Sequence, residues 1–544
     1  MKPYHVSGQV GPHLTTRNLL ILSAVIVVLV FLLDGNVGLN IPDEGFLWYG
    51  TIRTALGEIP VRDFQSYEPG RYYWGALWFK LLRNDGIMAL RISQSVFQFF
   101  GLSLALLLLR RLMNSWIALI AAAIILARWM FPIWKIYEPV ILIAAIYFAV
   151  LIIEDPSRVR HLVAGIFIGV AAFFGRNHGL YCVVAFVLLI AFVFFSIDRR
   201  ALLARLGALS LGIIIGYLPM WLMMAFVSGF FNRVIEDLAF NLHQGTTLPL
   251  AVPWPWRQSY RAVGIREVMN RLAVSSLFLA FPAFYLLAFV RLFWKQTVAH
   301  PVLIASAFVG VVYLHYTFGR PQLYYLAWTI PPVILGLLAA PASVSQQHRK
   351  KVAVVIWCIL VVFSLVALEM AQENYFTVKA RSFIKAKLLR RYDGNFELAM
   401  NAQDLVKKDV RGDNLWISSD TAKLIDSAKN IDQNLLQTND QILIVPYYPG
   451  LYAILQRRSP LWQIYFLLPR PVGDQEKMVQ DLESKQVNWV LVCHHYVDDR
   501  PELAFRNTHS VLWQYLVTNF EKIQTAETTH LEPACELRHR KDLK

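Results

Sequence analysis

Long apolar segments dominate the first 370 residues of this 544-residue chain. About 17–25 apolar residues suffice for a helix to cross a bilayer, and we count eleven such segments, of which the fourth and fifth are short. They predict an all-α polytopic membrane domain of about 11 transmembrane helices, at residues 18–33, 86–109, 115–134, 138–153, 161–174, 180–197, 206–226, 272–293, 301–318, 323–340 and 352–370. The composition, 56% hydrophobic and 16% charged, excludes a soluble enzyme. No small-residue cleavage site follows the first segment, which we interpret as a retained anchor.

Basic side chains fix the expected orientation of these segments. Cytoplasmic loops carry an excess of Lys and Arg, and every second short loop is basic if the N-terminus is cytoplasmic. These residues are Arg110, Arg111, Arg158, Arg160, Arg199, Arg200, Arg205, Arg291, Lys295, His348, Arg349, Lys350 and Lys351. We therefore expect a multi-pass membrane protein with a cytoplasmic N-terminus and a C-terminal domain outside the cytoplasm. The net charge of +15 is spread over loops, so no nucleic-acid partner is expected. One basic external loop, residues 227–271, fits either headgroup contact or an anionic ligand.

The composition becomes polar after Met370, which divides the chain into a membrane domain, residues 1–371 with a first external loop at 34–85, and a periplasmic domain, residues 372–544. Helices are expected at 382–392, 396–408, 475–484 and 502–520, and strands at 415–418, 442–446 and 489–493. Alternating strands and helices predict a small α/β domain. Cys493 and Cys535 both fall in this oxidising compartment, and whether they form a disulfide is left open.

The first external loop concentrates charge and aromatic residues beside the bilayer, where an isolated charge is costly. Asp43 and Glu44 open an amphipathic helix, a position that also suits a helix cap or an interaction with the helix dipole. Glu68 and Arg71 flank a turn and fit either a structural salt bridge or a metal-binding role for the acid. Metal dependence is left open, with Glu68 or Asp43 as the ligand if a divalent metal is used.

Other external loop ends also carry ionisable side chains. Each alone is explained by snorkelling or headgroup contact, but together they predict one cavity at the periplasmic membrane face. They are Lys135, Glu138, Arg176, His178, Glu236, Asp237, His243, His315 and Arg320.

The order of these charged and aromatic motifs along the chain resembles that in the GT-C glycosyltransferases, which take sugar from a polyprenyl-phosphate carrier. The resemblance is strongest to protein O-mannosyltransferases and bacterial lipid A aminoarabinose transferases. The resemblance covers most of residues 1–370. Glu138 stands where the family often has Asp, and Arg176 and Arg320 stand where it has Lys, an exchange that still permits phosphate binding. The matched residues are Asp43-Glu44, Glu68-Pro69-Gly70, Tyr72-Tyr73-Trp74, Glu138-Pro139, Arg176, Arg320, Tyr324, Tyr325 and Pro331-Pro332.

The resemblance implies a hexosyl- or pentosyltransferase that uses a polyprenyl-phosphate sugar and inverts the anomeric centre. Its acceptor would be a glycolipid, a polysaccharide or a protein. The resemblance also places the protein among the lipids of a bacterial inner membrane, with its C-terminal domain in the periplasm. The expected catalytic residues are Asp43, Glu44 and Glu138. Arg176, Arg320 and, as a weaker candidate, Arg261 are expected to bind the donor phosphate. Substrate or loop positioning is expected from Glu68, Arg71, His178, His243, His315 and Tyr324.

Two other functions use lipid-linked sugars. A transporter or flippase would place ionisable residues near the bilayer midplane and often shows repeated halves, whereas here the charges lie at outer span ends and no repeat is evident. An O-antigen ligase or polymerase would transfer a glycan from a pyrophosphate carrier. The identity of the released lipid separates these functions from the transferase.

Overall fold

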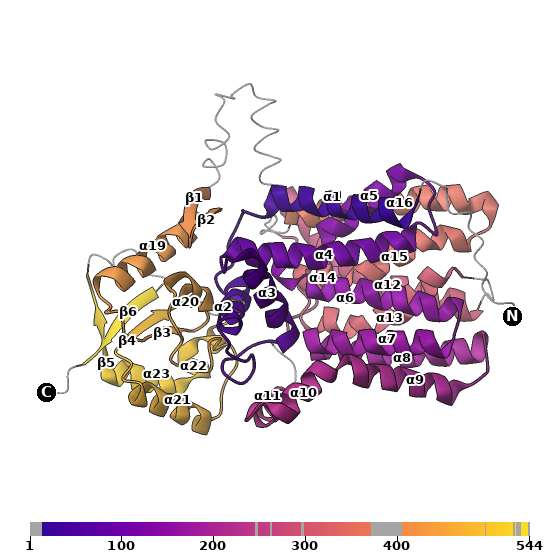
Figure 1. Ribbon diagram of the computed structural model, residues 1–544. Helices are drawn as coiled ribbons and strands as arrows, with labels where there is room; N and C mark the ends of the chain where they lie inside the picture. The colour runs from indigo at the N-terminus through magenta and orange to yellow at the C-terminus, as the bar shows by residue number, and fades with distance from the viewer. Residues whose placement is uncertain are drawn as a thin grey trace. The chain divides into compact units, whose positions relative to one another are not determined.

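The computed structural model describes residues 14–244, 248–261, 264–294, 299–370, 405–494, 497–525, 528 and 535–541. Its contacts divide the chain into two units (Figure 1). The membrane unit comprises Met1–Gly35 and Arg91–Thr377, and the second unit comprises Asn36–Leu90 and Val378–Lys544. The first external loop thus packs with the C-terminal residues, whereas the change in composition had suggested a boundary at residue 371.

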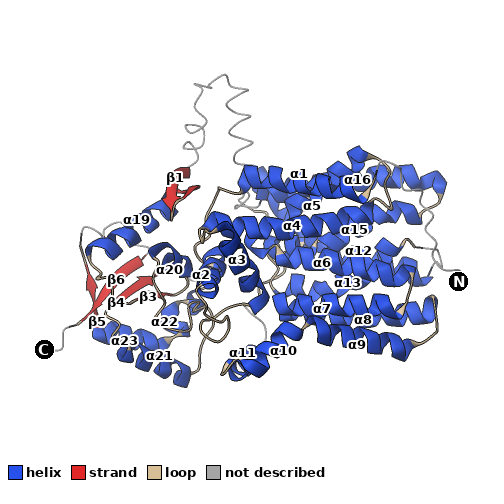
Figure 2. Ribbon diagram, in the orientation of Figure 1, coloured by secondary structure: helices blue, strands red, loops and turns tan. Residues whose placement is uncertain are grey.

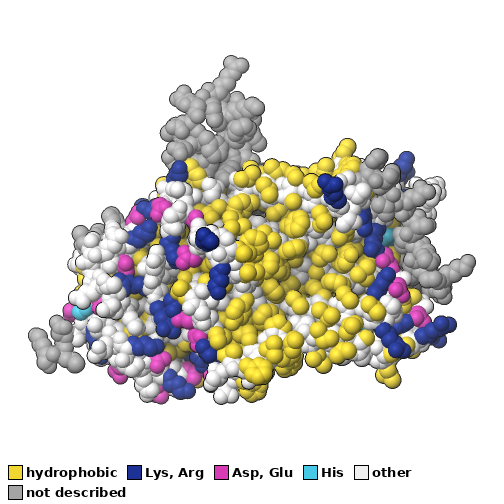
Figure 3. All heavy atoms as spheres, in the orientation of Figure 1, with side chains coloured by type: hydrophobic (Ala, Val, Ile, Leu, Met, Phe, Trp, Pro, Cys, Tyr) yellow, Lys and Arg dark blue, Asp and Glu magenta, His cyan; other side chains and the backbone are white. Residues whose placement is uncertain are grey.

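The membrane unit is helical throughout its described part, and each of the eleven apolar segments coincides with a helix or a bent helix pair. Apolar side chains cover much of the face of these helices that is in view in Figure 3, as lipid contact requires. The helices are α1 (Thr16–Asp34), α4 (Ile87–Leu109), α5 (Trp116–Trp129), α6 (Tyr137–Glu154), α7 (Arg158–Phe174), α8 (Arg176–Ser196), α9 (Leu202–Gly216), α10 (Leu218–Phe226), α11 (Phe230–Gln244), α12 (Ile265–Trp294), α13 (Pro301–Gly319), α14 (Leu323–Thr329), α15 (Pro331–Ala339) and α16 (Gln346–Met370), with short 3₁₀ turns η1 (Ile133–Lys135), η2 (Pro255–Arg257) and η3 (Ala340–Ser343).

Helix length and hydropathy give six candidate membrane spans in the described part of the chain, or up to eight if each bent pair is one span. The bends are 52° between α9 and α10 and 49° between α14 and α15. Prolines stand at the start of α10 and of α15, where a missing N–H interrupts the helical hydrogen bonds. Helices α5 and α7, with 14 and 17 residues, are shorter than these spans.

Helices α7 and α9 touch at backbone distance through paired glycines. A Cβ atom added at Gly165 would lie 2.2 Å from the carbonyl oxygen of Leu209, and one at Gly216 would lie 2.1 Å from that of Ile166. Gly165 and Gly169, like Gly212 and Gly216, have the small-xxx-small spacing of membrane helix interfaces. The backbones of α7 and α9 therefore pack directly against each other at these glycines.

The second unit is α/β. Strands are drawn in red in Figure 2, and its four-stranded sheet has the order β3-β4-β6-β5, with β3 and β4 parallel and the other pairs antiparallel. Strands β1 and β2 form a separate antiparallel hairpin. The elements are α2 (Asp43–Ala55), α3 (Pro69–Leu82), β1 (Leu405–Val410), β2 (Asp413–Ser418), α19 (Ser419–Asn434), β3 (Ile442–Val445), α20 (Pro449–Leu455), α21 (Val472–Ser484), β4 (Trp489–Cys493), η4 (Val497–Asp499), η5 (Pro501–Leu503), α22 (Phe505–Thr508), α23 (Ser510–Asn519), β5 (Phe520–Ile523) and β6 (Cys535–Arg540).

The predicted fold class is confirmed, and the three predicted strands coincide with β2, β3 and β4. The helix predicted at 396–408 is wrong at its end, because Leu405–Val410 pairs with β2 as a strand. Residues 382–392 and 396–404 lie outside the described residues. The helix predicted at 502–520 is divided into η5, α22 and α23, and Phe520 already belongs to β5. Cys493 and Cys535 face each other across β4 and β6 and form a disulfide.

Candidate functional site

Asn40 shapes the start of helix α2 and so places the two acids that open it. Its side-chain Oδ1 accepts a hydrogen bond from the backbone N–H of Asp43 at 2.7 Å. In return, Glu44 Oε2 accepts one from the backbone N–H of Asn40 at 3.3 Å. This reciprocal pair resembles a capping box, and the Glu44 side chain is fully buried. Glu44 therefore stabilises the helix start, while Asp43 remains partly exposed.

The side chain of Asp43 is held from the C-terminal part of the chain. Tyr465 Oη donates a hydrogen bond to Asp43 Oδ1 at 2.7 Å, across 422 positions in sequence. Burial raises the pKa of Tyr465 well above its usual value, and the nearby Asp43 carboxylate raises it further. The phenol is therefore a hydrogen-bond donor throughout the physiological pH range.

Glu68 and Arg71 lie at the start of helix α3. Glu68 is the N-cap residue, followed by Pro69 at the first helical position, where proline is well tolerated. The backbone N–H of Arg71 donates to the Glu68 carbonyl at 3.4 Å. The Arg71 side chain is buried, and its guanidinium lies 5.1 Å from the ring centre of Tyr67, a distance suited to a cation–π contact. Through these contacts, Glu68 and Arg71 both stabilise the turn before α3.

Several hydrogen bonds join the first external loop to residues 459–465. Gln65 is central to this joint, since its Oε1 accepts from the backbone N–H groups of Ile464 and Tyr465 at 3.1 and 2.9 Å. Its own N–H donates to the Trp462 carbonyl at 2.9 Å. Tyr49 Oη accepts from the Ser459 N–H, also at 2.9 Å. The segment that carries Tyr465 is thereby fixed against the loop that carries Asp43.

In the membrane unit, Arg176 begins helix α8 and pairs with an acid on α11. Its Nη2 lies 2.6 Å from Asp237 Oδ2, which also accepts a hydrogen bond from Asn241 Nδ2 at 3.1 Å. The Arg176 side chain is partly exposed. The guanidinium is thus already oriented by a carboxylate, and a phosphate could share or replace that partner.

Helix α8 also contacts the end of α13 through His178 and Tyr181. The buried His178 ring stacks on Tyr313, with Nδ1 3.3 Å from the phenol oxygen. Tyr181 Oη lies 2.8 Å from Nδ1 of the exposed His315. These contacts bring two of the predicted histidines to neighbouring turns of the same pair of helices.

An aromatic cluster extends from there to α14 and η1. The Tyr316 ring packs on Tyr325 and Trp328 at 5.3 and 6.2 Å between centroids. Lys135 Nζ lies 5.6 Å from the centre of the Trp328 ring. Tyr324 packs edge-on against a ring just before η1, that of Phe131. Within the membrane unit, segments from four loops predicted to be external therefore meet.

The remaining predicted residues differ in accessibility. Glu138 is buried in the first turn of α6, and the neighbouring Tyr137 ring packs on Phe174 near the start of α8. Arg320 follows the last turn of α13 and is partly buried. Arg261 and His243 are exposed, the former in a turn and the latter in the last turn of α11. Glu138 and Arg320 are thus close in sequence to members of the aromatic cluster, whereas the side chains of Arg261 and His243 are exposed.

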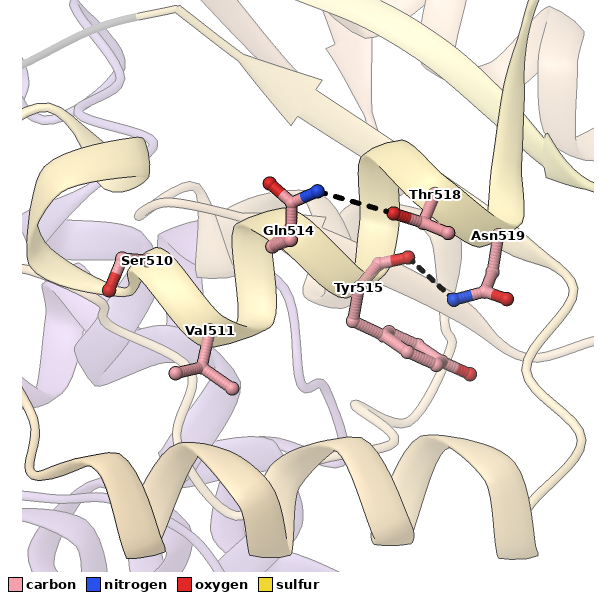
Figure 4. A pocket seen from close by; sticks show the side chains of 6 residues that line it. All are labelled: Ser510, Val511, Gln514, Tyr515, Thr518 and Asn519. Atoms are coloured by element: carbon pink, nitrogen blue, oxygen red, sulfur yellow. Dashed lines mark hydrogen bonds between the residues drawn. The ribbon is translucent and has the colours of Figure 1, made fainter.

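Among the described residues, no group of three or more His, Cys, Asp or Glu side chains could hold a metal ion. A hollow on α23 is lined by Ser510, Val511, Gln514, Tyr515, Thr518 and Asn519 (Figure 4). It contains none of the predicted site residues. Two of its side chains bond within α23 itself, Gln514 to Thr518 and Asn519 to the Tyr515 carbonyl.

Sequence reasoning did not single out Tyr465, Tyr181 or Tyr313. The two tyrosines on α8 and α13 lie one helical turn or less from predicted histidines, so spacing along a helix was a usable signal for them. Tyr465 had no local signal, because its partner belongs to the first external loop.

No protein-family model matches the chain, and no curated protein matches it by sequence. Comparison with solved structures shows that the chain shares its fold with ArnT. The crystal structure of ArnT from Cupriavidus metallidurans bound to undecaprenyl phosphate aligns with a TM-score of 0.53 and 12% identity, over 96% of this chain and 98% of that one. Its apo form aligns equally well, at 14% identity over the same shares of both chains. The apo oligosaccharyltransferase of Archaeoglobus fulgidus aligns with a TM-score of 0.43 and 12% identity, over 89% of this chain and 70% of that one.

Proposed function

We propose that the protein is an integral-membrane glycosyltransferase that moves a sugar from a polyprenyl-phosphate donor to an extracytoplasmic acceptor. The observation that carries the proposal is the fold shared, along nearly the full length of both chains, with an ArnT structure that holds undecaprenyl phosphate. The meeting of charged and aromatic side chains at helix ends of the membrane unit supports it further.

The sugar of such a donor is already activated, because the phosphate departs without needing a proton. The enzyme's tasks are to orient or deprotonate an acceptor hydroxyl and to stabilise the charge on the departing phosphate. General base catalysis contributes typically about 10²–10⁴-fold. In this proposal Asp43 is the base or acceptor-orienting group, because it is partly exposed and its carboxylate is held in place. The buried Glu44 supports the start of the helix instead.

Arg176 and Arg320 bind the donor phosphate in this proposal, through preorganised positive charge. Arg176 is the stronger candidate, since Asp237 already fixes its guanidinium. Glu138 is the second acid, which positions the sugar. His178, His315 and Tyr324 position the donor, and the exposed Arg261 is a weaker phosphate ligand.

A single displacement at the anomeric carbon gives inversion: the acceptor oxygen forms the new bond, the bond to the phosphate oxygen breaks, and the hydroxyl proton goes to the base. The products are the glycosylated acceptor and polyprenyl phosphate. A hexose or a pentose, and a glycolipid, polysaccharide or protein acceptor, are all compatible with this scheme. The site of action would be the periplasmic face of a bacterial inner membrane.

The test is sugar transfer by membranes that contain equal amounts of wild-type protein, Asp43→Asn or Asp63→Asn. Asp63 lies in the same loop and pairs with Arg62, so its variant controls for loss of one charge. We expect Asp43→Asn to lose at least about 100-fold in rate and the control to stay within about twofold. Undiminished transfer by Asp43→Asn would remove the catalytic assignment.

A further inference from the structure

The hydrogen bond between Tyr465 and Asp43 joins the C-terminal part of the chain to the residue proposed as base. We propose that Tyr465 is a positioning residue, which fixes one oxygen of the Asp43 carboxylate so that the other faces the acceptor hydroxyl. The C-terminal domain thereby completes the acceptor-activating site. This inference rests on the proposed function, since it acts through Asp43.

Tyr465 is well placed to hold a carboxylate because its own position is fixed twice. Its backbone N–H donates to Gln65 Oε1 at 2.9 Å. Its ring packs between Phe46 and Tyr447, with centroid distances of 5.2 and 5.5 Å. A side chain locked by packing and backbone bonds holds its partner more precisely than a mobile one.

Asp43 is also fixed at its backbone. Its N–H donates to Asn40 Oδ1 at 2.7 Å, and helix α2 begins at Asp43 itself. With the backbone held by Asn40 and Oδ1 held by Tyr465, rotation of the carboxylate would break a charge-assisted hydrogen bond, which is stronger than a neutral one. Among the described residues, no hydrogen bond to Oδ2 accompanies these contacts, so this oxygen is the one available to an acceptor hydroxyl.

The chemistry of the phenol suits a positioning role. Burial and the Asp43 charge both raise the pKa of Tyr465. The phenol therefore keeps its proton while the Asp43 carboxylate accepts the proton of the acceptor hydroxyl. Tyr465 therefore orients the base without competing for the acceptor proton.

The experiment compares Tyr465→Phe with Tyr49→Phe in the full-length protein. Both variants remove one hydroxyl from the joint between the first external loop and residues 459–465, but Tyr49 bonds to the Ser459 N–H and not to Asp43. Loss of a hydrogen bond to a charged group typically corresponds to about a 10-fold effect or more. We expect kcat to fall about 10-fold in Tyr465→Phe with an unchanged acceptor KM, and Tyr49→Phe to stay within about twofold of wild type.

A second comparison places Tyr465→Phe in the Asp43→Asn background. If Tyr465 acts through Asp43, the double variant has the same residual rate as Asp43→Asn, because effects of residues that work as a unit do not multiply. Equal losses in Tyr465→Phe and Tyr49→Phe, or a further loss in the double variant, would overturn the positioning role. If Asp43→Asn abolishes transfer while Tyr465→Phe is fully active, this inference fails and the proposed function stands. Full activity of Asp43→Asn instead defeats the catalytic assignment itself.

Discussion

Replacing Gly45 by Ala tests whether the first external loop and the C-terminal domain fold as one unit. Helices α2 and α20 touch there through two glycines. A Cβ atom on residue 45 would lie 2.5 Å from the Cα and 2.6 Å from the nitrogen of Gly450. Both neighbours are backbone atoms, so no side chain can rotate to make room.

The magnitude follows from three contributions. Alanine gains about 1 kcal/mol of helix propensity over glycine, while overpacking of this kind costs about 1–3 kcal/mol. Separating the helices also weakens the bond from the Gly450 N–H to the Ile41 carbonyl, 3.1 Å long and worth about 1 kcal/mol. The net loss is roughly 1–3 kcal/mol, which lowers the melting temperature of a unit of this size by about 3–10 °C.

The assay is thermal unfolding of the purified protein in detergent, followed by intrinsic fluorescence, together with the rate of sugar transfer. Gly473→Ala is the matched control, because a Cβ atom there meets no atom within 4 Å. We expect Gly45→Ala to melt lower and to transfer sugar more slowly, since Asp43 lies two residues away, and Gly473→Ala to melt at or above the wild-type temperature. A Gly45→Ala protein as stable and active as wild type would refute the close packing of α2 on α20.

Three further predictions follow from other contacts. Arg176→Ala should raise the KM for donor lipid about 10-fold or more with unchanged thermal stability, as measured by transfer at varied donor concentration; an unchanged KM would assign the arginine to structure alone. Burial, with a smaller effect of Arg470, lowers the pKa of His509 in the second unit to about 3. Below about pH 6.5 the unfolded chain therefore binds more protons than the folded state. We expect the free energy of unfolding of the second unit to fall from pH 6.5 towards pH 3, by about 2 kcal/mol at pH 5. Melting curves of wild type and His509→Gln between pH 7 and 5 check this, and parallel pH dependence of the two would contradict it. Replacing both Cys493 and Cys535 by Ala should cost about 2–4 kcal/mol, because their disulfide closes a loop with a sequence separation of 42; equal melting temperatures with and without it would contradict the expectation.

Much of the fold could be predicted from the sequence because its strongest signals are local. The bilayer demands long apolar runs, and every predicted span became helical. The buried strands β3 and β4 are short apolar runs and were also found. Strand β1 was missed because its sequence, LVKKDV, places two lysines in the centre, and only pairing with β2 makes it a strand.

The candidate site was predictable where neighbouring residues share a helix end. Arg176 and His178 on α8, and His315 on α13, were predicted from their position at span ends. Within the membrane unit, contacts through Tyr313 and Tyr181 connect His178 with His315. Tyr465 could not be found in this way, because its bond to Asp43 spans 422 positions and depends on the folding of the first external loop against the C-terminal domain.

The most direct test of the central claim is the identity of the lipid released during sugar transfer. Purified protein in liposomes would receive a polyprenyl-phosphate sugar or a polyprenyl-pyrophosphate glycan, and the lipid products would be analysed by mass spectrometry. We predict that glycosylated acceptor and polyprenyl phosphate form together from the first donor and that Asp43→Asn forms neither. Release of polyprenyl pyrophosphate, or movement of intact donor across the bilayer with no released lipid, would contradict the proposed glycosyltransferase.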